Sequence, residues 1–404
     1  MQDDTDLSLE VVILLILGMF MLVFGFLLFK IHAGRLSYNP DSTYGLFLVI
    51  VSFQVITMGK TPFGDIRRSW ALITIGICTA IFGMFDCFIP GYVTGFSRIF
   101  VGIVLFAGGI TLFLQLFFAK ERARTWLVSG GVLQQLTIAC AITYILTIFI
   151  GVISLFPVTT TDKRTAVLLI AYGLSFFYLS RCIWKVRQVY GAESVTENPR
   201  DAASKYWPYI FREASLPLSM AILIILGILL TLLGLLLFPV NLGMIAFSPD
   251  GQLGLLLTVT AIQMMSLGET PLGHFKRSWS IITIGLLFAA LGVVSAIVPG
   301  LLTGMIQVII GLFNLGGGAV SLIQRYLPMR RDINATGGAP GIVPPNVRKL
   351  TSIQTTLNCV QIAFGAATLV PGVIPGLLMA GLLVVNGLLV FMLASALSKV
   401  MTVA

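Results

Sequence analysis

A long segment occurs twice in this chain, and the two copies lie 209 positions apart. Residues 11–115 align without a gap with residues 220–324. The offset relates identical residues at several points: Gly18 to Gly227, Pro40 to Pro249, Gln54 to Gln263, and Pro90 to Pro299. A fixed period over such a length indicates a duplicated structural unit.

The composition predicts an integral membrane protein. Hydrophobic residues make up 57% of the chain and charged residues only 10%, whereas about a quarter of a typical soluble domain is charged. Apolar runs near twenty residues recur along the sequence, and each is long enough for about 30 Å of hydrocarbon. We expect the lipid bilayer to be the main partner. Nucleic acid is not expected, because the basic residues lie in short loops, where they set topology.

The apolar runs and the repeat together predict an all-α polytopic bundle. We expect about twelve transmembrane helices in two parallel six-helix repeats, each built from three helical hairpins. The predicted boundaries are 1–187 for the first repeat, 188–216 for a cytoplasmic linker and 217–404 for the second repeat. Loops are expected at 120–124 and 326–350.

Two kinds of local signal refine these helices. Asn39-Pro40-Asp41 and Ser248-Pro249-Asp250 each combine a cap, a proline at the first helical position and an acid near the positive helix end. These signals predict helix starts at Pro40 and Pro249. The second signal is small-residue spacing: Gly83, Pro90, Gly102 and Gly109 are 7, 12 and 7 apart, which predicts a tight hairpin because glycine lets helices approach closely in lipid.

Charge distribution predicts the orientation. If both termini are inside, the inner loops and ends hold 20 of the 25 Lys and Arg residues. The outer side then keeps Lys30, Arg35, Arg98, Lys163 and Arg164. We therefore expect both termini to be cytoplasmic, in a bacterial or archaeal cytoplasmic membrane.

The loop Gly59–Trp70 and its copy Gly268–Trp279 allow two interpretations. An ordinary inner-face loop accounts for every residue, through a glycine helix end, basic residues at the headgroups and an interfacial tryptophan. The alternative is a conformational latch, because opposite charges stand at equivalent positions: Lys60 against Glu269, and Asp65 against His274. The candidate latch residues are Lys60, Asp65, Arg67, Arg68, Glu269, His274, Lys276 and Arg277.

Amides inside the apolar runs are candidates for a neutral polar pathway, namely Gln54, Gln263, Asn314 and Asn386. Interhelical hydrogen bonding is the simpler explanation for them, and the pathway is the alternative. Asp86 lies near the outer end of its run, where solvation at the interface accounts for it more simply than an ion-coupling role, because it has no buried ionisable partner in the sequence.

Catalysis finds little support. Only His32 and His274 are present, predicted on opposite faces, and the five cysteines are scattered singly. No phosphate-binding, zinc-protease or nucleophile-elbow motif occurs. We expect no enzyme activity and no catalytic, cofactor or metal site.

Two families resemble parts of this pattern. The two six-helix halves, the central loop and the glycine- and arginine-rich loops at Gly59–Arg68 and Gly268–Arg277 resemble the major facilitator superfamily. That family's usual Asp-basic-x-Gly core is absent here. The hairpin segments 83–109 and 292–318 resemble the HdeD-like family of small bacterial inner-membrane proteins, which is linked to acid resistance, so that the chain would be a tandem double of such a unit.

These resemblances imply two functions. The first is a facilitator-like pathway or binding site for a small neutral solute between the two repeats. The alternative is an HdeD-like, non-transporting stress protein, or a scaffold that packs against other membrane subunits.

The latch hypothesis predicts a coupling between Lys60 and Glu269. Lys60→Glu and Glu269→Lys should each lower the free energy of unfolding, and the double variant should recover the loss, with a coupling of up to about 1 kcal/mol because exposed pairs are weak. Thermal unfolding of all four proteins in detergent measures this coupling. Simple additivity of the two losses would contradict the latch.

Overall fold

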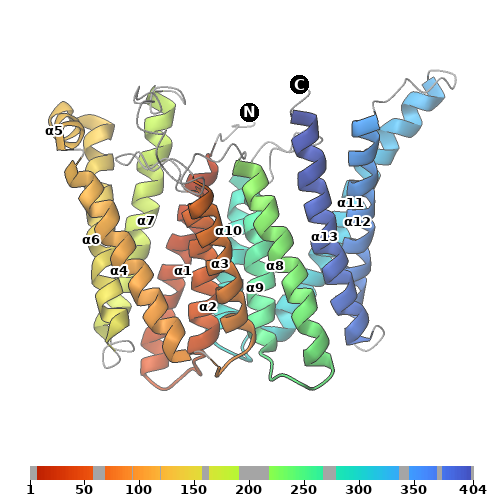
Figure 1. Cartoon of the computed structure of the whole chain (residues 1–404), viewed down its shortest axis with the longest axis horizontal. Coiled ribbons are helices and arrows are strands. Elements are labelled where there is room, and N and C mark those ends of the chain that lie inside the picture. The colour runs from red at the N-terminus through yellow and green to blue at the C-terminus, as the bar shows by residue number, and fades with distance from the viewer. Residues whose placement is uncertain are drawn as a thin grey trace. The chain divides into compact units, whose positions relative to one another are not determined.

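The protein is an α-helical polytopic membrane protein (Figure 1). The computed structural model describes residues 7–57, 69–92, 94–118, 120–156, 163–190, 218–266, 279–335, 345–370 and 375–401. Within these ranges the chain forms thirteen α-helices and no β-strand. Nine of these described helices are long and apolar enough to cross a membrane: α1, α3, α4, α6, α7, α8, α10, α11 and α13.

The helices divide into two compact units. The first unit contains α1 (Leu9–His32), α2 (Pro40–Thr57), α3 (Trp70–Phe88), α4 (Thr94–Phe118), α5 (Lys120–Ser129), α6 (Gly131–Leu155), α7 (Lys163–Tyr190), α9 (Pro249–Ser266) and α10 (Trp279–Ile297). The second unit contains α8 (Leu218–Asn241), α11 (Thr303–Ala335), α12 (Pro345–Leu369) and α13 (Gly376–Met401). These are packing units, whereas the boundaries 1–187, 188–216 and 217–404 follow the sequence repeat and stay a prediction.

The predicted helix starts at Pro40 and Pro249 are confirmed. The Asn39 side chain accepts a hydrogen bond from the Ser42 backbone N–H at 3.2 Å. The Ser248 hydroxyl accepts one from the Gly251 N–H, also at 3.2 Å. Both caps satisfy backbone donors that a helix N-terminus leaves without an intrahelical partner.

Pro90-Gly91 and Pro299-Gly300 form equivalent turns in the two copies of the repeat. Gly91 and Gly300 have φ angles of 91° and 79°, a region that L side chains rarely adopt. The Gly91 N–H donates to the Asp41 carboxylate at 2.6 Å. This bond holds the start of α2 against the turn that follows α3.

The two helical pairs α2–α3 and α9–α10 meet through reciprocal backbone hydrogen bonds. The Asn39 N–H donates to the Ile297 carbonyl at 3.0 Å, and the Ser248 N–H donates to the Phe88 carbonyl at 3.1 Å. The donors Asn39 and Ser248 are 209 positions apart, and so are the acceptors Phe88 and Ile297. Each bond therefore joins one copy of the repeat to the other, with the roles exchanged. The α9–α10 pair therefore packs in the first unit, although its sequence lies in the second half of the chain.

Glycines form the closest helix contacts. A Cβ on Gly83 would lie 2.6 Å from the Gly45 carbonyl oxygen across the α2–α3 contact, and a Cβ on Gly292 would lie 2.7 Å from the Gly254 oxygen across α9–α10. Close packing of the same kind joins α1 to α7, α4 to α6, α8 to α13, and α11 to α12. Each of these contacts lies within one unit.

This arrangement corrects the predicted hairpin at Gly83, Pro90, Gly102 and Gly109. Gly83 faces α2, whereas Gly102 and Gly109 face Leu155 and Ile148 of α6. The backbones of the consecutive helices α3 and α4 rarely approach each other closely, because their glycine faces point to different neighbours. Their contact is made by large side chains, such as the Phe82 ring against Phe96 and Phe100. The closely packed pairs are instead α2–α3 and, across the short helix α5, α4–α6.

Two predicted loops are partly helical. The segment expected as a loop at 120–124 opens α5, whose sequence KERARTWLVS is rich in helix-forming residues. The loop expected at 326–350 is shorter than predicted, because α11 continues to Ala335 and α12 begins at Pro345. Proline suits the first position of a helix, where its missing N–H costs nothing.

The close approach of α2 and α3 predicts that Gly83→Ala destabilises the protein by about 1–3 kcal/mol, the usual cost of overpacking. The new methyl group would press on the Gly45 oxygen and on Leu48 Cβ at 2.8 Å. Thermal unfolding in detergent measures the effect. Gly381→Ala in α13 is the control, since its Cβ would meet open space. Equal unfolding temperatures for the two variants would contradict a glycine-dependent contact.

Candidate functional site

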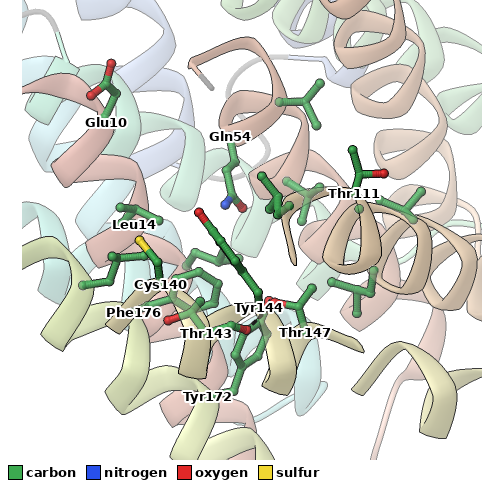
Figure 2. A pocket seen from close by; sticks show the side chains of 18 of the residues that line it. Glu10, Leu14, Gln54, Thr111, Cys140, Thr143, Tyr144, Thr147, Tyr172 and Phe176 are labelled. Atoms are coloured by element: carbon green, nitrogen blue, oxygen red, sulfur yellow. Dashed lines mark hydrogen bonds between the residues drawn. The ribbon is translucent and has the colours of Figure 1, made fainter. Parts of the chain in front are cut away.

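A cavity of about 280 Å³ lies among α1, α2, α4, α6 and α7 of the first unit. Most of its lining is apolar, from residues such as Leu14, Phe47 and Phe176. The polar groups come mainly from α6, and α1, α2, α4 and α7 each add one (Figure 2). A mostly apolar cavity with a few polar groups is the usual form of a small-molecule site.

Four residues of α6 present a polar stripe to this cavity. Cys140, Thr143, Tyr144 and Thr147 are spaced three or four apart or adjacent, so they share one helix face. The Tyr144 side chain is buried among apolar neighbours and lies beside the Cys140 thiol. Tyr144 and the Gln54 amide point toward one another in the cavity (Figure 2).

The hydroxyl groups on the floor of the cavity are already hydrogen-bonded. The Thr147 hydroxyl donates to the Thr143 carbonyl at 2.7 Å. The Tyr172 and Thr147 hydroxyls lie 2.8 Å apart, and because the Thr147 proton is used, Tyr172 is the donor. The Thr143 hydroxyl donates to the Ala139 carbonyl at 2.8 Å. These groups can still accept hydrogen bonds from a ligand through their remaining lone pairs.

The charged residue at the edge of the cavity is paired. Glu10 of α1 accepts a hydrogen bond from the Arg187 guanidinium of α7 at 2.9 Å. Both side chains are partly exposed, so the pair contributes little free energy by itself. The pair joins the start of α1 to the end of α7, and the Arg187 guanidinium neutralises the charge of the Glu10 carboxylate.

The four predicted pathway residues are divided between the two units. Gln54 lines the cavity, whereas Gln263, at the equivalent position of α9, is half-buried and is not part of the lining. Asn314 and Asn386 belong to the second unit. The Asn314 amide donates to the Ile310 carbonyl of its own helix at 2.8 Å. Whether these residues form a pathway stays a prediction.

The eight candidate latch residues lie outside the described residues: Lys60, Asp65, Arg67, Arg68, Glu269, His274, Lys276 and Arg277. Sequence reasoning missed the polar groups of α6 and α7, including Tyr144 and Tyr172. Both helices fall outside the repeated segment 11–115, on which the search for equivalent polar positions depended. The three-and-four spacing of the α6 stripe was the signal that could have found them.

The fold and the lining of the cavity define the class: an integral, polytopic α-helical membrane protein with a small, mostly apolar cavity. Comparison of the chain with protein-family models, curated proteins and solved structures finds no match.

The cavity predicts a graded reactivity of introduced cysteines. In a variant without the five native cysteines, Gln54→Cys should react with a small neutral thiol reagent, because position 54 faces the cavity. Val49→Cys in the same helix should stay unreactive, since Val49 is fully buried. Mass spectrometry of the labelled protein measures the rates, and equal rates at positions 49 and 54 would contradict an accessible cavity.

Proposed function

We propose that the chain is a protein of the bacterial or archaeal cytoplasmic membrane, with twelve spanning helices in two parallel six-helix repeats and both termini cytoplasmic. Nine described helices meet the length and composition needed to span. The remaining three spans would be α2, α9 and α12, each of which packs closely along one of those nine. The 18 residues of α2 cover about 27 Å at 1.5 Å per residue, close to the thickness of the hydrocarbon core.

The reciprocal hydrogen bonds support the parallel repeat. Two copies of one structural unit, related by a two-fold axis along the membrane normal, make each contact twice with the partners exchanged. The bonds Asn39–Ile297 and Ser248–Phe88 have this property. An inverted repeat would place equivalent residues at opposite membrane faces, where they could not exchange such bonds.

The function proposed for the protein is binding or facilitated passage of a small neutral solute. The observation that carries this proposal is the cavity among α1, α2, α4, α6 and α7, with its apolar walls and the polar groups of Gln54 and Tyr144. Such a cavity suits a molecule with an apolar body and one or two hydrogen-bonding groups. The binding site proposed here lies within the first six helices rather than between the repeats, where two-repeat transporters usually hold their substrates.

A non-transporting role is the second candidate, as an HdeD-like stress protein or a scaffold for other membrane subunits. The observation that favours it is the glycine packing of the helix pairs, which turns many large side chains outward. Exposed examples in the first unit are Phe26, Ile75, Phe149 and Leu174. Lipid or a partner helix would cover these side chains equally well. Neither candidate assigns a catalytic, cofactor or metal role to the chain.

The proposed binding site predicts a selective effect of Gly108→Leu. Gly108 lines the cavity, and a Cβ there would meet no atom within 4 Å, so a leucine would fill the cavity without straining the helix. We expect the variant to fold and to bind solute at least about ten-fold more weakly, a loss of about 1.4 kcal/mol. The measurement is the shift in unfolding temperature with a panel of neutral solutes graded from glycerol to phenol.

Gly316→Leu is the matched control. Gly316 is an exposed glycine of α11 with open space around its Cβ and does not line the cavity. The control should bind as the wild-type protein does. If no solute in the panel shifts the wild-type protein, or if Gly108→Leu retains the full shift, the solute-binding proposal fails and the non-transporting role is preferred.

A further inference from the structure

Asp86 is fully buried, contrary to the expectation that solvent at the membrane interface accounts for it. The side chain lies two residues before Phe88, the last residue of α3, and has 0% exposure. Neither carboxyl oxygen has a hydrogen-bond partner among the described residues. A buried carboxyl group with two unsatisfied oxygens is costly, and such residues inside membranes usually mark functional sites.

Asp86 belongs to a group of ionisable and polar side chains at this end of α2, α3 and α4. The Ser97 hydroxyl of α4 lies against its carboxyl group, although neither Asp86 oxygen has hydrogen-bond geometry with it. Asp41, at the start of α2, lies within electrostatic range of Asp86. One Asp41 oxygen accepts the Gly91 N–H, and the other is buried without a partner among the described residues.

Two tyrosines and one arginine complete the group. Tyr44 of α2 lies within electrostatic range of Asp86, Asp41 and Arg98. Tyr38, in the segment before α2, interacts with Tyr44 and Thr43, and desolvation raises the pKa of its phenol, so that it stays neutral. On the α9 side, Asp250 lies at the equivalent position to Asp41 and has interactions of its own. The thiol of Cys87 is used, since it donates to the Gly251 carbonyl at 3.3 Å.

The second copy of the repeat shows that the fold does not need this group. Positions 209 further along hold the following residues: Phe247 for Tyr38, Leu253 for Tyr44, Ser295 for Asp86, Ile306 for Ser97 and Gln307 for Arg98. The α9–α10 pair nevertheless forms the same glycine contact as α2–α3. Ser295 is satisfied locally, because its hydroxyl donates to the Asp250 carbonyl at 3.2 Å. The ionisable group is therefore an addition to the first copy and not a requirement for packing.

We propose that Asp86, together with Asp41, binds a small monovalent cation, either a proton or Na⁺, at this end of α3. The carboxyl oxygens of both residues, with the hydroxyls of Ser97 and Tyr44 nearby, offer the hard oxygen ligands that such a cation requires.

Infrared difference spectroscopy of the full chain in lipid nanodiscs tests this proposal. One arm changes the pH at constant Na⁺ concentration, and the other changes the Na⁺ concentration at constant pH. Other carboxylates of the chain also respond to pH, so the band that matters is the one present in the wild-type protein and absent from the Asp86 variants. We expect that band to change in at least one arm. A change in the first arm identifies the proton as the ligand, and a change in the second identifies Na⁺.

Two variants assign the band. Asp86→Ser, which places the second copy's residue at this position, should abolish the band, and the isosteric Asp86→Asn should do the same if the serine variant folds poorly. Asp250→Asn is the matched control, because it removes the equivalent of Asp41 from the copy that has serine in place of Asp86. The control should keep the band. The proposal is overturned if the wild-type protein shows no carboxyl response in either arm, or if the band persists without Asp86.

Discussion

The exchange of two backbone hydrogen bonds between α2–α3 and α9–α10 is the contact on which the first unit depends. Each bond joins the residue before one helix to the last residue of another, so it satisfies a polar group that hydrocarbon could not solvate. Glycines also bring α2 onto α3 and α9 onto α10, and Gly251 of α9 packs against the Cys87 carbonyl of α3. Packing and polar satisfaction therefore reinforce each other, which is the condition for a specific structure without a hydrophobic driving force between helices.

The sequence predicted those features that depend on local chemistry. Proline, asparagine and serine at 39–40 and 248–249 marked two helix starts, since capping needs only neighbouring residues. Helix partners were not predictable in the same way. Gly83 and Gly102 follow a regular spacing, yet spacing along the chain does not specify which neighbour each glycine faces. That choice depends on α6, which lies outside the repeated segment.

The candidate site was predictable only in part for a related reason. Gln54 stood out because it recurs as Gln263, and it does line the cavity. The tyrosines and threonines opposite it have no counterpart within the repeat, and their meeting with α2 results from tertiary packing. Asp86 shows the opposite case. The second copy has Ser295 at the equivalent position, and this difference between the copies, rather than a shared residue, pointed to the candidate cation site. Differences between copies of a duplicated unit separate what a fold requires from what a function has added.

The pairing of α1 with α7 has a consequence for biosynthesis. The last residue of α1 and the first of α7, His32 and Lys163, are 131 positions apart. At typical rates of translation this separation corresponds to on the order of ten seconds. During that time Gly18 of α1 lacks the Gly173 backbone against which it packs. Nascent α1 must therefore stay in lipid, in the translocation machinery or against a temporary neighbour, until the sixth apolar segment leaves the ribosome and the first half of the bundle can close.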